Sequence, residues 1–134
     1  MQNTKMRGPY PRLTLRLIQD LTPIFRKKKR IAAVYLFGST ATGRDRRGRD
    51  LDLAIVAKRT ISARERLRIE ADLSNRLRRD VDLVIFGQVA PLLQHQILKY
   101  GHLICENDPA ERVRQEVRAR AEYLDTRLLF REIQ

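Results

Sequence analysis

Three short apolar runs constrain the fold of this chain more than any other feature. They cover residues 32–37 (AAVYLF), 51–57 (LDLAIVA) and 81–86 (VDLVIF). Runs of this length with β-branched and aromatic residues are typical of buried strands. Two of them carry an aspartate inside the apolar segment, Asp52 and Asp82, where an unpaired charge is costly. The sequence therefore predicts strands that hold acids at a site where an ion pair or a metal compensates their charge.

Segments with helical periodicity separate these strands. Pro23 either kinks the first helix or begins a second one, and Ser62 with Glu65 forms a capping box for the next. The alternation of helices and strands predicts an α/β (α+β) fold, in which helices pack on a small mixed β-sheet. Helices are expected over residues 12–29, 62–78, 91–100 and from 109 onward, with a short fourth strand over 102–105.

The last expected helix carries an apolar stripe. It consists of Val113, Val117, Ala121, Leu124 and Leu128. Because these residues recur at helical spacing, most of the stripe is expected to pack on the sheet. A remainder is left as a surface for a partner protein: Leu129, Phe130 and Ile133.

Length and composition limit the domain count, the compartment and the partners. We expect a single domain over residues 1–134, with residues 1–11 as a loosely ordered N-terminal arm. One cysteine and no apolar run of membrane-spanning or signal-peptide type indicate a cytoplasmic protein without membrane association. The net charge of +12 favours polyanionic ligands, such as nucleoside triphosphates or nucleic acid, or an acidic protein. Nucleic-acid binding is not required, because outside residues 26–30 the basic residues are spread along the chain and the tyrosines are scattered.

Gly38 and Ser39 follow the first apolar run and form a candidate phosphate-binding turn. A glycine lets the backbone turn sharply and lets a phosphate approach closely. Ser39 offers a hydroxyl and an N–H where a helix is expected to begin, and Thr40 offers a further hydroxyl. Because Gly-Ser after a strand is also common at ordinary turns, the pair indicates a phosphate site only together with the acids that follow.

Asp50 and Asp52 open the second apolar run. Residues i and i+2 of a strand share a face and lie about 6.6 Å apart, so both carboxylates can point to one place. Oxygen ligands of this kind suit Mg²⁺, and two such ions can clamp the attacking and leaving oxygens of a phosphoryl transfer. The alternative is an acidic strand edge in which Asp52 pairs with an arginine.

Asp82 supplies a third carboxylate on another apolar strand. Asp80 lies on the same face by parity, but it follows Arg78 and Arg79 and is interpreted as their partner or as a turn cap. We therefore choose Asp82 to complete the metal site and to accept the proton of an attacking hydroxyl. His95 and His102 have no companions at zinc spacing and are interpreted as surface or packing residues.

The pattern Gly38-Ser39-x10-Asp50-x-Asp52, followed by Asp82, resembles the DNA-polymerase-β-like nucleotidyltransferase superfamily. The likeness to its minimal nucleotidyltransferase branch runs from about Leu36 to Leu128. It implies the polymerase-β-like fold, a triphosphate contact at Ser39 and two magnesium ions held by the three aspartates.

Many members of that branch are antitoxins encoded beside a HEPN-domain ribonuclease toxin. The resemblance implies AMP transfer from ATP to a hydroxyl of that toxin, a tyrosine in the family pattern. One departure is Thr42, where relatives often carry an arginine. Either Arg44 takes over its phosphate contact, or triphosphate binding is weaker than in those relatives. The alternatives are an antitoxin that acts by binding alone and a nucleotidyltransferase for a small molecule.

Overall fold

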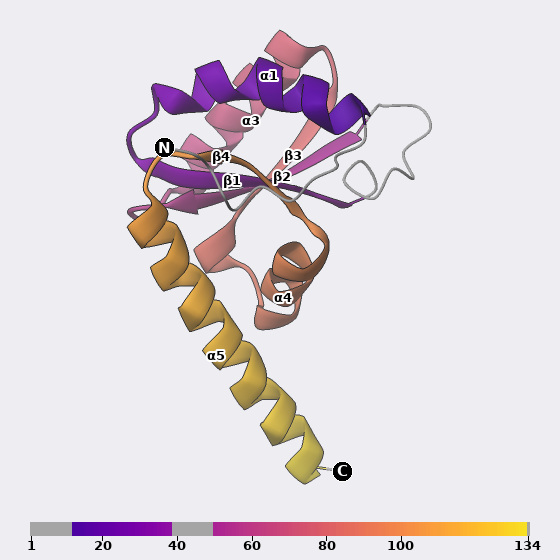
Figure 1. The fold of residues 1–134 in the computed structure, drawn as a ribbon, viewed down its shortest axis with the longest axis vertical. Helices are drawn as coiled ribbons and strands as arrows, with labels where there is room; N and C mark the ends of the chain where they lie inside the picture. Colours follow the sequence, from indigo (N-terminus) through magenta and orange to yellow (C-terminus); the bar gives the residue numbers. More distant parts are fainter. Residues whose placement is uncertain (1–11, 39–49, 134) are drawn as a thin grey trace.

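The computed structural model describes residues 12–38 and 50–133, so the expected N-terminal arm, Ser39, Thr40 and Arg44 lie outside the described residues. In chain order the elements are α1 (Arg12–Arg26), β1 (Ile31–Phe37), β2 (Asp50–Ala57), α3 (Ala63–Leu77), β3 (Asp80–Ile85), the 3₁₀ turn η1 (Phe86–Gln88), α4 (Pro91–Tyr100), β4 (His102–Glu106) and α5 (Pro109–Ile133) (Figure 1). All four expected strands are therefore confirmed.

The strands form one mixed sheet in the order β3-β2-β1-β4. β1 pairs antiparallel with β2 and β4, whereas β2 and β3 run parallel. α1 and α3 cover one face of the sheet, and α4 with the first turns of α5 covers the other (Figure 1). The structure thus confirms the α/β (α+β) arrangement of helices on a small mixed sheet.

Alternation along the strands divides the core in two. In β2, Leu51, Leu53 and Ile55 are fully buried against α1 and α3. Ala54 and Val56 point the other way, toward α4 and α5. Because side chains alternate with a period of two, Asp52 of β2 and Asp82 of β3 lie on the α4 face. The hydrophobic residues between them anchor the strands from the opposite side.

α1 ends at Arg26 rather than at residue 29, and Pro23 lies inside it without starting a second helix. The Nδ2 group of Asn107 donates to the carbonyls of Phe25 (2.9 Å) and Ile31 (3.0 Å), on either side of the turn that follows α1. The bond to Phe25 satisfies a carbonyl that a longer helix would have bonded internally. A local bond from the Lys28 N–H to the Phe25 carbonyl (2.9 Å) and the distant contact from Asn107 together stabilise the end of the helix.

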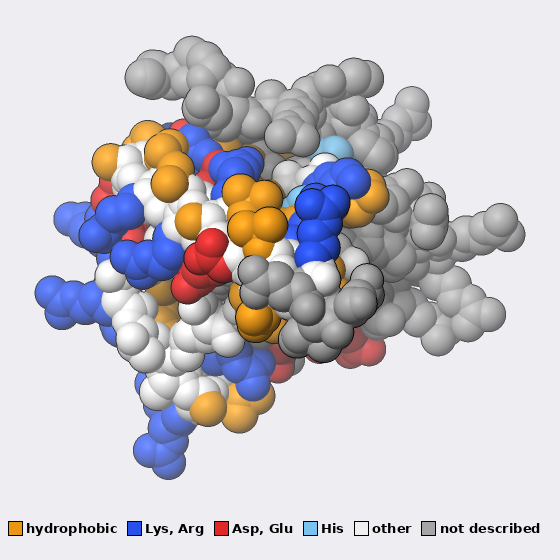
Figure 2. Space-filling view, turned by 90° about the horizontal axis from the view of Figure 1, so that it is seen from below, with side chains coloured by type: hydrophobic (Ala, Val, Ile, Leu, Met, Phe, Trp, Pro, Cys, Tyr) orange, Lys and Arg blue, Asp and Glu red, His pale blue; other side chains and the backbone are white. Residues whose placement is uncertain are grey.

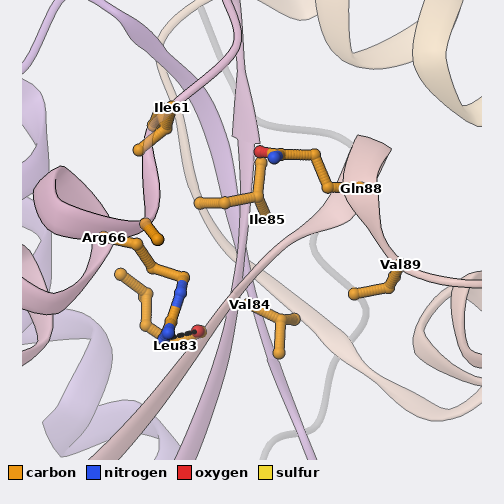
Figure 3. Close-up of a pocket in the computed structure, with 8 residues that line it drawn as sticks. Ile61, Arg66, Leu83, Val84, Ile85, Gln88 and Val89 are labelled. Atoms are coloured by element: carbon orange, nitrogen blue, oxygen red, sulfur yellow. Dashed lines mark hydrogen bonds between the residues drawn. The ribbon is translucent and has the colours of Figure 1, made fainter.

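Side chains of α3 bond the outer edge of β3. The N–H of Val81 donates to Ser74 Oγ at 3.1 Å, and that of Leu83 donates to Glu70 Oε2 at 2.8 Å. Arg66 donates to the Leu83 carbonyl at 3.2 Å (Figure 3). The exposed strand edge is thereby protected from pairing with another chain.

The start of α3 follows only half of the predicted capping box. Ser62 Oγ accepts from the N–H of Glu65 at 3.1 Å, as expected for an N-cap. The carboxylate of Glu65 instead pairs with Arg30 at 2.7 Å.

The apolar stripe of α5 does not pack on the sheet, and that prediction is wrong. Its largest members are exposed by 43% at Val113, 59% at Val117, 55% at Leu124 and 56% at Leu128. Among the side chains of α5 that the structure describes, the buried ones are Arg112 and Ala119. α5 leaves the sheet after its first turns and extends away from the body (Figure 1). Within the described residues, no helix has the length and apolarity needed to cross a membrane.

Candidate active site

The parallel pairing of β2 with β3 aligns the aspartates side by side. Asp50 is opposite Asp80, and Asp52 is opposite Asp82. Neighbouring strands lie about 4.8 Å apart and paired residues share a face, so Asp52 and Asp82 flank one spot on the α4 side of the sheet. The register thus brings Asp52 and Asp82 together, and the predicted metal-binding role of these acids stays a prediction.

The two carboxylates differ in exposure. Asp52 is half-buried, whereas Asp82 is exposed. This difference favours a positioning and ligand role for Asp52 and free access of a substrate to Asp82. Asp80 is also exposed, but the register puts it beside Asp50 rather than beside Asp52.

Gly38 joins the two halves of the sequence motif. Phe37, the last residue of β1, pairs with Asp52, so the chain turns at Gly38 beside that acid. The φ of Gly38 is +78°, a left-handed conformation that favours glycine. A Cβ at this position would lie 3.0 Å from Cγ of Asp52 and would overlap its carboxylate. Both the backbone conformation and the close approach therefore require glycine here.

The donor set at the strand ends fits a divalent metal in its chemistry. Asp52 and Asp82 offer carboxylate oxygens on one face of the sheet. The backbone of Asp50 lies on β2, two residues before Asp52. Magnesium prefers such hard oxygen ligands and commonly shares them with substrate phosphates. No group of three or more metal-binding side chains occurs among the described ones, and the side chain of Asp50 is not among them. The three-carboxylate metal site therefore stays a prediction.

A buried ionic network lies on the same face of the sheet, deeper than the aspartates. The hydroxyl of Tyr35 donates to the carboxylate of Glu116, and Arg112 bonds both Glu116 (2.6 Å) and Glu106. The Arg112 side chain is only 4% exposed. The network ties the first turns of α5 to β1 and β4, and so fixes the helix relative to the site.

Proton affinities within this network are shifted. Burial raises the pKa of Tyr35, and its hydrogen bond with Glu116 raises it further. Burial alone would raise the pKa of Glu116, but the hydrogen bonds from Tyr35 and Arg112 hold it below its ordinary value. Tyr35, Arg112 and Glu116 therefore contribute a protonated phenol, a charged guanidinium and a carboxylate to the network. The spacing of Arg112 and Glu116 as i and i+4 was its one signal in the sequence.

His95 and Tyr123 connect α4 to α5. Their rings stack with centroids 3.8 Å apart and an angle of 5° between planes. The interpretation of His95 as a packing residue is confirmed, and the stack supports α5 beyond the sheet.

A pocket of about 270 Å³ lies between β3, η1 and the start of α3 (Figure 3). Its wall is mainly aliphatic, from Ile61, Val84, Ile85 and Val89. Arg66 is its one charged lining residue and already bonds the Leu83 carbonyl. The pocket therefore offers no acid, base or nucleophile, and the catalytic candidates remain the aspartates at the opposite end of β2.

Comparison with known families matches residues 19–110 to the family described as polymerase beta, nucleotidyltransferase. The matched segment contains the whole sheet, Gly38 and the aspartates at 50, 52 and 82.

Individual relatives agree with this match. The chain is 30% identical over 87 residues to protein adenylyltransferase MntA of Shewanella oneidensis. The aligned segment covers 65% of this chain and 58% of that protein. It is similar in structure to a chain of a toxin–antitoxin crystal structure with AMP-PNP (TM-score 0.69, 24% identity, 89% and 90% of the two chains). It is also similar to a chain of the complex of a tri-AMPylated Shewanella oneidensis HEPN toxin with an MNT antitoxin (TM-score 0.67, 22% identity, 90% and 92%). These likenesses establish the polymerase-β-like nucleotidyltransferase fold.

Proposed function

We propose, from the premise that this chain belongs to the polymerase beta nucleotidyltransferase family, that it is an antitoxin that transfers AMP from ATP to a HEPN-domain toxin. The observation that carries the proposal is the alignment of Asp52 with Asp82 on one face of the sheet, with Gly38 against Asp52. A relative named protein adenylyltransferase and a fold shared with complexes of a HEPN toxin and an MNT antitoxin support the reaction and the partner.

In the proposed reaction, a hydroxyl oxygen of the toxin attacks the α-phosphorus of ATP. The new P–O bond forms as the bond to pyrophosphate breaks. The hydroxyl proton passes to the carboxylate of Asp82, which is exposed and can be reached by an incoming side chain. In the family pattern the acceptor is a tyrosine.

Asp50, Asp52 and Asp82 are the residues that would hold magnesium. When bound, Mg²⁺ supplies positive charge that offsets the triphosphate and the pyrophosphate leaving group. The protein's own contribution is to hold Asp52 between Gly38 and the sheet, so that its carboxylate needs no reorganisation when substrate arrives. Gly38, Ser39, Thr40 and Arg44 are the proposed phosphate contacts, and a cytoplasmic location fits the supply of ATP.

The test is transfer of label from α-phosphate-labelled ATP to the product of the neighbouring gene, in the presence of Mg²⁺. We expect labelled partner with the wild type and none with Asp52→Asn. Asp20→Asn, which removes an exposed carboxylate on α1, is the matched control and should label as the wild type does. Equal neutralisation of the toxin by Asp52→Asn, without label, would favour an antitoxin that acts by binding alone. Labelling of a small molecule instead of the partner would favour the other alternative.

A further inference from the structure

Antiparallel pairing of β1 with β2 brings two separate basic segments together. Ile31 at the start of β1 pairs with Ala57 at the end of β2, and the N–H of Lys58 donates to the Arg30 carbonyl at 2.9 Å. The basic run at residues 27–30 therefore lies beside Lys58 and Arg59. At about 3.3 Å per residue, this end of β2 is about 17 Å from Asp52.

The first turns of α5 add further cations at this end of the sheet. A pocket of about 370 Å³ lies between the segment after β2, η1 and α5, and its basic lining residues are Lys58, Arg59, Arg114 and Arg118. Figure 2 shows Lys and Arg side chains standing out on the side where α5 begins in Figure 1. We call this surface the basic end and define it as Lys27, Lys28, Lys29, Arg30, Lys58, Arg59, Arg114 and Arg118.

Ion pairs compensate only part of this charge. Arg30 pairs with Glu65, Lys58 with Asp108 and Arg114 with Glu111. Arg59 and Arg118 are exposed, and neither has an ion-pair partner within residues 12–38 and 50–133. Their guanidinium groups are therefore available to an anion, and the planar guanidinium is suited to phosphate oxygens.

The basic pocket adjoins the aliphatic pocket of about 270 Å³ beside β3, because Ile85 and Gln88 line both. Figure 3 shows the Gln88 side chain beside Ile85 in the aliphatic pocket. An apolar pocket with an amide at its rim suits a nucleobase, whose faces are apolar and whose edge carries hydrogen-bonding groups. Such a base has to be unpaired to enter, because bases in a duplex are stacked and paired.

We propose that the basic end binds single-stranded nucleic acid, with phosphates against Arg59 and Arg118 and one unpaired base in the adjoining aliphatic pocket. Cationic grooves that follow the backbone, combined with apolar contacts to bases, are the general mode of single-strand binding. The proposal does not rest on AMP transfer, because the site lies at the other end of β2 from the aspartates.

The test is fluorescence anisotropy of the full chain with a labelled single-stranded RNA of about 10 nucleotides. Parallel arms use single-stranded DNA of the same sequence, the RNA duplex and an abasic strand of equal length. We expect both base-bearing single strands to bind more tightly than the duplex and the abasic strand. The ratio of the affinities for single-stranded RNA and DNA shows which of the two polymers the site prefers.

The discriminating variant is Arg59→Glu/Arg118→Glu, and the matched control is Arg127→Glu/Arg131→Glu in the far half of α5. Both change the net charge equally, but only the first removes cations of the basic end. We expect the first to weaken binding roughly tenfold or more and to lower the salt slope by about 1.4, which corresponds to two phosphate contacts. The control should stay within about twofold of the wild type. Arg59→Gln/Arg118→Gln should fall between the two, with an unchanged circular dichroism spectrum.

Three results would overturn the proposal. One is the absence of binding to any single strand at about 100 mM salt. Another is an equal loss in the two double variants, which would mean that only the overall charge matters. The third is binding of the duplex or the abasic strand as tightly as the base-bearing single strands.

Discussion

The carboxylate of Asp52 lies against Cα of Gly38, in the space that a β-carbon of any other residue would occupy. The turn that follows β1 and the acid on β2 therefore fix one another's position. Because Gly38 also has a φ of +78°, a substitution would disturb the turn and the acid together.

Gly38→Ala is expected to reduce AMP transfer by about 100-fold or more, since a shift of the acid by about 1 Å misplaces the reacting groups. It should also lower the free energy of unfolding by about 1–3 kcal/mol because of the left-handed backbone. Initial rates and urea denaturation measure the two effects. Gly87→Ala is the control, because its Cβ would meet only the end of the Gln115 side chain, at 3.3 Å. AMP transfer by Gly38→Ala at the wild-type rate would contradict the claim that Gly38 positions Asp52 for the reaction.

Asp82→Asn and Asp80→Asn compare the contributions of two exposed acids on the same face of β3 to AMP transfer. The register aligns Asp82 with Asp52, so Asp82→Asn is expected to slow AMP transfer by about 100- to 10,000-fold. Asp80→Asn should slow it by less than about tenfold, because the register keeps Asp80 away from Asp52, the acid that packs on Gly38. Steady-state rates at saturating ATP make the comparison. The reverse order of the two effects would assign the proton acceptor to Asp80.

Arg112→Met tests the buried network that holds α5. The substitution leaves Glu106 and Glu116 without their shared cation in a buried place, and should cost about 3–5 kcal/mol of unfolding free energy. Arg120→Met, which removes the exposed end of the same network, should cost less than about 1 kcal/mol. Thermal and urea denaturation give both values, and equal costs would show that burial of Arg112 contributes nothing.

The lowered pKa of Glu116 predicts that the fold loses stability in acid. Its pKa in the folded chain is below the ordinary value, so its carboxylate stabilises the fold above the unfolded pKa of about 4.3. This stabilisation is lost as the pH falls through the folded-state pKa. We therefore expect the unfolding free energy to decline with falling pH less steeply in Glu116→Gln than in the wild type. Glu122→Gln, at an exposed position of α5, controls for the loss of one carboxylate, and parallel curves for Glu116→Gln and the wild type would contradict the assignment.

The strands and the common face of the acids were predictable because they depend on local patterns. Parity alone puts Asp50 and Asp52 on one face of their predicted strand, and Asp80 and Asp82 on one face of theirs. The parallel pairing that puts Asp82 beside Asp52, and the closure of Gly38 onto Asp52, arise from strand order, which the local pattern does not contain.

The packing predicted for α5 was wrong because tertiary contacts outweighed the apolar stripe in its sequence. Arg112 looks like a solvated residue, yet it is buried because Tyr35, Glu106 and Glu116 surround it. Its burial turns the helix so that Val117 and Leu124 face solvent. The basic end was missed for a related reason: residues 27–30, 58–59 and 114–118 are far apart in the sequence and meet only in the folded sheet.

The most direct measurement of the central claim is the intact mass of the toxin after incubation with this protein, ATP and Mg²⁺. The account predicts a mass gain equal to one or more AMP groups with the wild type and with Asp20→Asn, and an unchanged mass with Asp52→Asn. Fragmentation of the modified toxin should locate the added group on a hydroxyl side chain. An unchanged mass with the wild type, under conditions in which it still neutralises the toxin, would contradict the account.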